Sequence, residues 1–416
     1  MTSSNTRAST SRLRFRIGAL AFLSFNLAMA CMWGTFGVLL TAIEAKMGVG
    51  REVSSLAASV VMVSVALSAP VAGILSSKFS LRLLLMVGSL LGSVGYILLA
   101  LASNIQVTLL AYGLLVGPSL CLCGVVGPGT LVTRWFAAGR GRALGLVHIP
   151  IVVALMPLLA TFVLHQQGLS TVYIMLAVLM GLNLIAQAFV VDHPTIMSQT
   201  SGEAISAAPV DPGLTTRQLF FRLRFWSMAV AFSSNIGGTM LLSAHLVPMA
   251  TGWGNDPARA ASLLTLMSLA GMLGPLTFGW LADKLGGRLT LTILCFDSAV
   301  LWAVLLSKPP FPVLALVIAL FGLHSSGSIP AFAMSLSEYF GQSSFARAYG
   351  LGNMVTLPFT VLMIPLAAIM FVHTGSYGSA LLVQACFFLV AALFVLAIGG
   401  PRTPVKPAVA VSEPAT

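Results

Sequence analysis

Long apolar runs separated by short charged connections are the feature that most restricts how this chain can fold. Hydrophobic residues make up 58% of its 416 residues and charged residues only 7%, whereas ordinary soluble domains contain about 25% charged residues. The bilayer core offers no partner to a free peptide group, so such a chain crosses it as helices of about 20 apolar residues. The sequence therefore predicts an all-α integral membrane protein.

Twelve such runs follow one another, six on each side of a polar linker. They fall at roughly 17–42, 54–77, 82–103, 107–133, 144–165, 170–191, 225–251, 259–282, 288–307, 312–336, 349–373 and 377–399. The run after Arg16 is too long for the apolar core of a signal peptide, which has about 7–15 residues. The expected segments are a cytoplasmic N-terminal tail (1–16), a six-helix half (17–191), a cytoplasmic linker (192–224), a second six-helix half (225–399) and a cytoplasmic C-terminal tail (400–416).

An internal repeat relates the two halves. The segment Gly279–Arg288, Gly-Trp-Leu-Ala-Asp-Lys-Leu-Gly-Gly-Arg, has a weaker copy 206 residues earlier at Gly73–Arg82. The segment Arg142–Gly145 returns as Arg347–Gly350, 205 residues later. Two pairs at nearly one spacing predict two six-helix pseudo-repeat halves.

The net charge of +11 follows from topology rather than from nucleic-acid binding. The basic residues are dispersed between apolar runs instead of forming one solvated cluster, so no nucleic-acid partner is expected. With the N-terminus inside, 17 of the 21 Lys and Arg residues fall in inner segments, and the outer loops hold Lys46, Arg51, Arg259 and Lys308. Because cytoplasmic loops collect Lys and Arg, both termini are expected in the cytoplasm and the protein in the plasma (inner) membrane.

The segment Gly279–Arg288 also has the chemistry of a latch at the membrane surface. Gly279 permits a close helix approach, and Asp283 supplies a carboxylate that could bind the free amides at the N-terminus of a neighbouring helix. In the first-half copy, Ser77 occupies the carboxylate position, so that latch should be weaker. The alternative is a surface turn whose charges only set topology.

Twelve spans in two halves, with this segment between the eighth and ninth, resemble the major facilitator superfamily. Both halves further resemble its monocarboxylate porters and oxalate and formate exchangers. The segments that carry this resemblance are Phe36–Leu40, Val53–Leu56 with Pro70, Arg134–Phe136, Arg140–Leu146, and His245–Pro248 ahead of Ala260 and Ala261. The resemblance implies a secondary active transporter that works by alternating access and moves a small organic monocarboxylate, coupled to protons or by exchange.

The resemblance also implies partners and gating residues. The expected partners are a small-molecule substrate, the lipid bilayer and protons, in a monomer without a cofactor. The latch segment would pair with the start of helix 5 near Arg142. The gating candidates are Asp283, Arg288, Gly279, Arg142 and Arg347.

One family position differs in this chain. Carboxylate-binding members carry an arginine in helix 8, eight residues before the signature acid, and that position here is Pro275. A buried anion without a compensating charge or many donors is costly. Export of a neutral or hydrophobic small molecule is therefore the alternative, and a non-transporting membrane receptor or sensor is a remote one.

By the resemblance, helices 1, 4, 7 and 10 line a central cavity, so polar residues on them are the substrate-site candidates. The repeat offset maps a stripe of helix 4, Ser119, Cys123 and Thr130, onto His324, Ser328 and Ser335 of helix 10. The full set is Asn26, Thr35, Ser119, Cys123, Thr130, Asn235, Thr239, His245, His324 and Ser328. For each residue the alternative is a bond to a helix backbone or to a neighbouring helix. His324 is the main candidate, because imidazole can donate, accept or carry charge, while a structural role is the alternative for His245.

Asp297 is the one acid well inside a predicted span, in helix 9. An intramembrane carboxylate is a candidate for proton coupling, and a protonated or hydrogen-bonded packing role is the alternative. The five cysteines fall in apolar runs and read as small buried hydrophobes. Neither a metal site nor a catalytic cluster nor a phosphate-binding loop is predicted, so the chain is not expected to be an enzyme.

Overall fold

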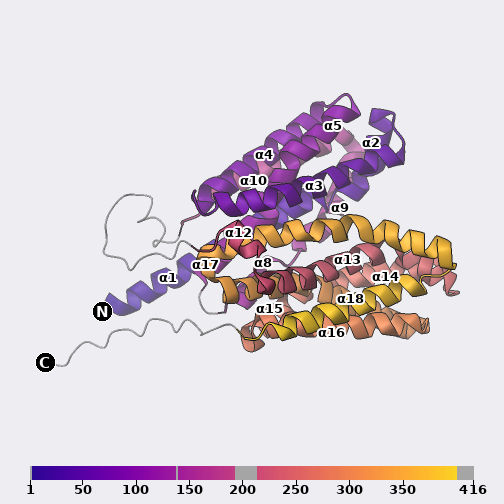
Figure 1. Ribbon diagram of the computed structural model, residues 1–416. Helices are drawn as coiled ribbons and strands as arrows, with labels where there is room; N and C mark the ends of the chain where they lie inside the picture. Colours follow the sequence, from indigo (N-terminus) through magenta and orange to yellow (C-terminus); the bar gives the residue numbers. More distant parts are fainter. Residues whose placement is uncertain (1, 137–138, 193–212, 401–416) are drawn as a thin grey trace.

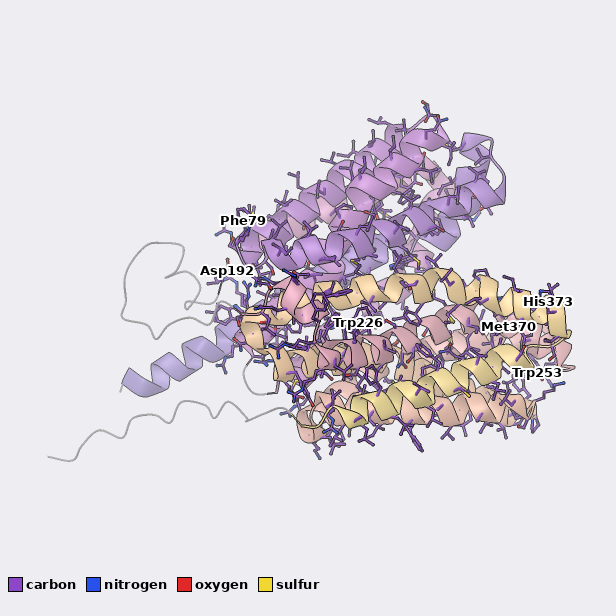
Figure 2. All side chains as sticks on the ribbon, viewed as in Figure 1. Phe79, Asp192, Trp226, Trp253, Met370 and His373 are labelled. Atoms are coloured by element: carbon purple, nitrogen blue, oxygen red, sulfur yellow. The ribbon has the colours of Figure 1, made fainter. Side chains whose placement is uncertain are left out.

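The computed structural model describes residues 2–136, 139–192 and 213–400, and every element within them is a helix (Figure 1). The helices form two bundles. The bundles touch at the end where the first helix begins and the last helix ends, which we call the terminal end. They diverge toward the opposite end. Figure 2 shows Phe79 and Asp192 near the terminal end, and Trp253, Met370 and His373 at the opposite end.

The first half contains six spans, several of them built from consecutive helices. They are α1 (Thr2–Met32) with α2 (Phe36–Met47); α3 (Arg51–Leu75); α4 (Leu81–Leu101); the series α5 (Ile105–Ala111), η1 (Tyr112–Val116), α6 (Gly117–Leu120), η2 (Cys121–Val126) and α7 (Gly127–Trp135); α8 (Arg140–Val147) with α9 (Ile151–Gln167); and α10 (Leu169–Gln187). The labels η1 and η2 mark π-helical turns.

The second half contains the other six spans. Its helices are the short α12 (Thr216–Phe220), α13 (Leu223–Gly252), α14 (Pro257–Gly271) with α15 (Gly274–Leu285), α16 (Gly287–Leu306), α17 (Phe311–Thr374) and α18 (Gly378–Ala397). The 64-residue α17 holds two spans, because its backbone leaves the helical conformation at Gly341, where φ is 70°.

The predicted fold is confirmed. Ten helical stretches of the described chain are long and apolar enough to cross a membrane, and α14 with α15 forms a further pair bent by 42°. Counting α17 as two spans that meet at Gly341 then gives the predicted twelve.

The predicted tails and linker are only partly described. Helix α1 extends through the predicted N-terminal tail to Thr2. The linker 192–224 is described at residue 192 and again from residue 213, and there a capping box between Thr215 and Gln218 starts α12. The rest of the linker and the C-terminal tail beyond residue 400 lie outside the described residues.

Two π-helical turns interrupt the fourth span, each directly before a Gly-Pro pair. The Gly117 N–H donates to the carbonyl of Tyr112, and the Gly127 N–H donates to the carbonyl of Leu122, five residues back in each case. The following prolines lack an N–H and cannot continue the regular ladder. Such wider turns rotate the residues on either side relative to a regular α-helix, which changes the face that this span shows to its neighbours.

At the terminal end, α8 of the first half crosses α15 of the second without room for side chains. A Cβ added to Gly145 would collide with the carbonyl oxygen of Pro275, and one added to Gly279 would collide with that of Gly141. Glycine is needed at both positions because the two backbones are in direct contact.

The same crossing recurs between α3 and α17. A Cβ added to Gly350 would collide with the carbonyl oxygen of Ala69, and one added to Gly73 with that of Ala346. The repeat offset maps this crossing onto the first, so two copies of one backbone contact join the halves at the terminal end.

We predict that a single methyl group at the first crossing separates the terminal ends. In Gly145→Ala the added Cβ meets a backbone carbonyl, whereas in the matched control Gly37→Ala it meets nothing within 4 Å. Pulsed EPR between spin labels at Lys78→Cys and Lys284→Cys, with the exposed Cys386 replaced by serine, should show a longer distance population in Gly145→Ala and an unchanged one in the control. Identical distance distributions in Gly145→Ala and Gly37→Ala would contradict direct backbone contact at this crossing.

Candidate functional site

A cavity of about 200 Å³ lies between the two halves. Its first-half wall comes from the first, second and fourth spans and includes Trp33, Met62 and Leu120. Its second-half wall comes from α13, with Ile236 and Met240, and from the second span of α17. Because both halves contribute residues, the cavity has the position that a solute site has in proteins built from two membrane repeats.

The polar part of the cavity is a row on α17 formed by Asn353, Thr356 and Thr360. Spacings of three and four residues place these side chains on one face of the helix. Asn353 Nδ2 donates to the carbonyl of Tyr349 (2.8 Å), Thr356 Oγ1 to that of Asn353 (2.7 Å) and Thr360 Oγ1 to that of Thr356 (3.0 Å). Every described residue that lines the cavity is uncharged, so this row supplies most of its polarity.

Trp33 reaches the cavity because the first span is broken at its position. Helix α1 ends at Met32 and α2 begins at Phe36, with a turn between them. Gly34 lies within this turn against α9, where an added Cβ would be 2.9 Å from Met156 Cβ. The break leaves the Trp33 side chain 38% exposed.

None of the ten predicted substrate residues is among the described residues that line this cavity. In the fourth span, Cys123 Sγ lies 3.3 Å from the carbonyl oxygen of Leu85 in α4. Ser119 of the same span packs against Gly92, which also belongs to α4. Thr130 donates to a carbonyl of its own span (2.7 Å). In this structure the predicted stripe therefore faces the third span or its own backbone.

The π turns change which residues of the fourth span share a face. Leu120 and Val125 line the cavity, although residues five apart lie about 140° apart on a regular α-helix. The intervening turn η2 changes this angle and brings both residues to one wall. A fixed rotation of 100° per residue does not hold along this span.

The predicted stripe on helix 10 faces α15. The His324 side chain is 6% exposed and packs edge-on against Phe278, with ring centroids 5.3 Å apart. Ser328 Oγ donates to a carbonyl of its own helix (2.6 Å). This face lies inside the second half rather than between the halves.

The helix 7 candidates join helices within the second half. Asn235 Nδ2 lies 3.6 Å from Cys295 Sγ of α16, and Thr239 Oγ1 lies 2.5 Å from Ser325 Oγ of α17. His245 Nε2 lies 3.0 Å from a carbonyl oxygen of α17. These contacts correspond to the structural alternative.

The helix 1 candidates stabilise helix breaks. Asn26 Nδ2 donates to the carbonyl of Ile149, and its Oδ1 accepts from the N–H of Val152, both at 3.0 Å. The Asn26 side chain thus satisfies backbone groups where α8 gives way to α9 around Pro150. Thr35 Oγ1 donates to a carbonyl of α1 (2.7 Å).

Asp297 is half-buried on α16. Phe296 and Val300, which lie beside it along this helix, are 53% and 48% exposed. Asp297 therefore lies near the face of the bundle that points away from the other half, and it is not among the described cavity residues. Its coupling role stays a prediction.

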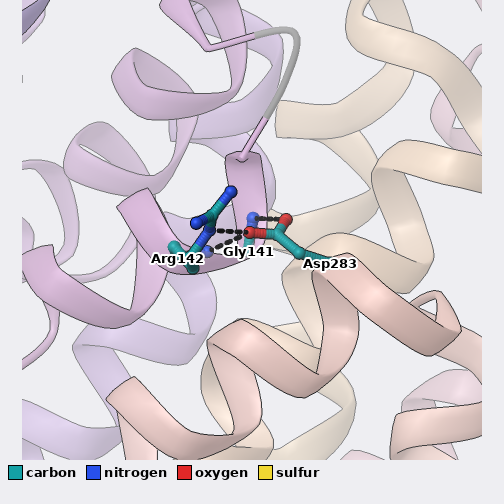
Figure 3. Close-up of polar contacts among 3 residues, drawn as sticks. All are labelled: Gly141, Arg142 and Asp283. Carbon is teal, nitrogen blue, oxygen red and sulfur yellow. Dashed lines mark hydrogen bonds and ion pairs between the residues drawn. The ribbon is translucent and has the colours of Figure 1, made fainter.

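At the terminal end, Asp283 of α15 binds the start of α8 in the other half (Figure 3). Its Oδ1 accepts from the Gly141 N–H (2.6 Å), and its Oδ2 accepts from the Arg142 N–H (2.9 Å) and Nε (3.1 Å). Helix α8 receives no side-chain cap from its own N-cap residue, Gly139. Asp283 therefore caps a helix of the opposite half, at the place where the sequence put the latch partner.

The copy of this contact in the first half lacks the carboxylate. Arg347 Nη2 donates to Ser77 Oγ at 2.8 Å, and the repeat offset pairs these residues with Arg142 and Asp283. A hydroxyl carries no charge and forms a weaker bond to a guanidinium than a carboxylate does.

Further polar contacts surround the latch. Glu338, which the sequence did not single out, accepts from the Gly287 N–H with both oxygens (3.0 Å), and Arg140 donates to Ser337 Oγ (2.9 Å) across the halves. The one available signal was that Glu338 is among only 10 acidic residues. Arg288 Nε donates to a carbonyl of α18 (3.2 Å), so it joins two helices of one half.

The sequence matches the Major Facilitator Superfamily profile over residues 21–296 and 229–415. It is 26% identical over 328 residues to monocarboxylate transporter 13 of Bos taurus, covering 77% of this chain and 74% of the bovine protein. It is 27% identical over 299 residues to the oxalate:formate antiporter of Oxalobacter formigenes, covering 68% of this chain and 67% of the antiporter. The Escherichia coli fucose:proton symporter has a similar structure, with a TM-score of 0.71 at 17% identity over 91% of this chain and 97% of that one.

We expect Asp283→Ala to open the terminal end and impair transport while leaving membrane insertion intact. Even the loss of a single charge-assisted hydrogen bond costs about 1.5–3 kcal/mol, so the closed form should lose at least roughly 10-fold in relative population. The control Asp256→Ala removes a carboxylate that caps α14 within one half and should leave the EPR distances across the terminal end unchanged. Full activity and an unchanged distance distribution in Asp283→Ala would contradict the latch.

Proposed function

This chain belongs to the major facilitator superfamily, and from that membership we propose that it carries a small organic solute across a membrane by alternating access of the central cavity. The observation that carries the proposal is a cavity between two halves that are joined at one end by a duplicated backbone crossing. Separating these crossings while the opposite ends close would expose the cavity to the other side.

The proposed orientation places the terminal end in the cytoplasm of the plasma (inner) membrane. Arg140, Arg142, Lys284 and Arg347 lie at the helix ends or latch contacts there. An excess of basic residues on one side is typical of cytoplasmic loops. The conformation described is then open toward the outside and closed toward the cytoplasm.

The gating role belongs to the contacts that close this end. Asp283 and Arg142 join the halves by charge-assisted bonds, and Gly279 allows the helices to approach. Arg347 acts at the second crossing through Ser77. Arg288 has a supporting role, since it ties α16 to α18.

A small monocarboxylate, coupled to protons or by exchange, is the first substrate candidate. It is supported by the names of two relatives, a monocarboxylate transporter and an oxalate:formate antiporter. Asp297 is the candidate for proton coupling, supported by its depth in α16 and by a proton symporter among similar structures. A monomer remains the proposed assembly.

A neutral small molecule is the second candidate, and the cavity itself favours it. The described lining residues carry no charge, and Pro275 stands where the resemblance to carboxylate porters implies an arginine. The cavity of about 200 Å³ is smaller than the roughly 300–1,000 Å³ of pockets for drug-sized ligands, so either solute must be small.

Uptake into proteoliposomes with an imposed pH gradient tests the proposal. Short and aromatic monocarboxylates are compared with neutral compounds of similar size, and empty liposomes give the passive background. We expect saturable uptake of at least one solute, reduced at least tenfold in Asp283→Ala. Gradient-dependent uptake of a monocarboxylate would support the first substrate candidate. Uptake of neutral compounds alone would support the second. Ligand binding without any net movement would exclude transport.

A further inference from the structure

The hydrogen-bond balance of the cavity indicates what kind of polar group it can hold. A Thr hydroxyl has one proton to donate and two lone pairs to accept. Thr356 and Thr360 both spend this proton on a carbonyl of their own helix. Both hydroxyls therefore face the cavity as acceptors only.

Asn353 adds a further acceptor to the same row. One of its two amide protons is spent on the carbonyl of Tyr349, while Oδ1 keeps its acceptor capacity. Met62 and Met240 contribute only weakly accepting thioethers. The donors left among the described lining residues are the indole N–H of Trp33 and the amide of Asn353, whose side chain also hydrogen-bonds that of Tyr349.

This balance is unfavourable for an anion. A carboxylate has about four lone-pair sites to satisfy, and two neutral donors without a cation leave it under-solvated. Burying an unpaired charge is strongly destabilising. An organic cation meets acceptors but no counter-charge, since the described lining contains no acid.

We propose that the acceptor row Asn353, Thr356 and Thr360 is a specificity site for a neutral solute that has an O–H or N–H at its polar end and an apolar body. The polar end donates to the row on α17, and the body contacts Trp33, Met62 and Ile236 on the facing walls. This inference rests on the proposed function for the cavity, and it selects the second substrate class.

Three probes with one ring and different polar ends test the proposal: benzyl alcohol donates, benzyl methyl ether only accepts, and benzoate is an anion. Binding is measured by isothermal titration calorimetry on the full chain in nanodiscs, with protein-free nanodiscs as the blank. We expect benzyl alcohol to bind about 3- to 10-fold more tightly than the ether, the usual effect of one neutral hydrogen bond, and benzoate to bind most weakly.

Matched threonine variants test whether the acceptor row causes the preference for the alcohol over the ether. Thr356→Val removes an acceptor and keeps the shape, and it should weaken alcohol binding about 3- to 10-fold while leaving ether binding unchanged. The control Thr292→Val removes a hydroxyl that also donates to its own helix, but on α16 and outside the cavity lining. Asn353→Asp, which adds a charge to the row, should create a preference for benzylammonium and keeps the test valid if the valine variant misfolds.

The outcomes separate this inference from the transport proposal. Benzoate binding as tight as that of the alcohol, equal alcohol affinity in Thr356→Val and Thr292→Val, or no alcohol binding at all overturns the acceptor row. If alcohol binding depends on Thr356 but no solute is transported, the acceptor row is supported and the proposal of alternating access is contradicted. Saturable uptake limited to anions keeps transport and overturns the row.

Discussion

Direct backbone contact between the halves is the constraint on which the arrangement of this protein depends. Gly145 and Gly350 each lie against a carbonyl of the opposite half, so two helices from each half meet with no side chains between them. Only this approach brings Asp283 within hydrogen-bond distance of the Gly141 amide. The two crossings lie at the terminal end, and the cavity lies between the same two halves farther along α3 and α17.

Much of the fold could be predicted from the sequence, because hydrophobic length and an internal repeat are local properties of the chain. Residues in apolar runs must form helices in a bilayer, and the offset near 206 residues gave the two halves. The latch pair was also predictable, since Asp283 lies in a segment with little freedom and a helix start is the natural partner of a carboxylate.

The faces of the spans could not be predicted in the same way. A regular helical period places Ser119 and Cys123 on one face, but π turns beside Pro118 and Pro128 alter that period. Helical spacing places His324 on the polar face of helix 10, and in the structure this face packs against Phe278 of the same half. The row of Asn353, Thr356 and Thr360 has a readable spacing of three and four, but it lies on the eleventh span, whereas the family resemblance places the cavity on helices 1, 4, 7 and 10.

If the halves move as proposed, the unequal contacts of Asp283 and Ser77 bear on the geometry of that motion as well as on its energy. Two identical closures would lie symmetrically about the pseudo-two-fold axis, and the halves would part evenly. Here one closure is ionic and the other is a neutral acceptor for Arg347. In the proposed alternating access, the ionic contact would hold the α8–α15 side longer than the hydroxyl contact holds the α3–α17 side. The early displacement would then be a hinge with its pivot off the symmetry axis, and an opening path would form first along one flank of the protein.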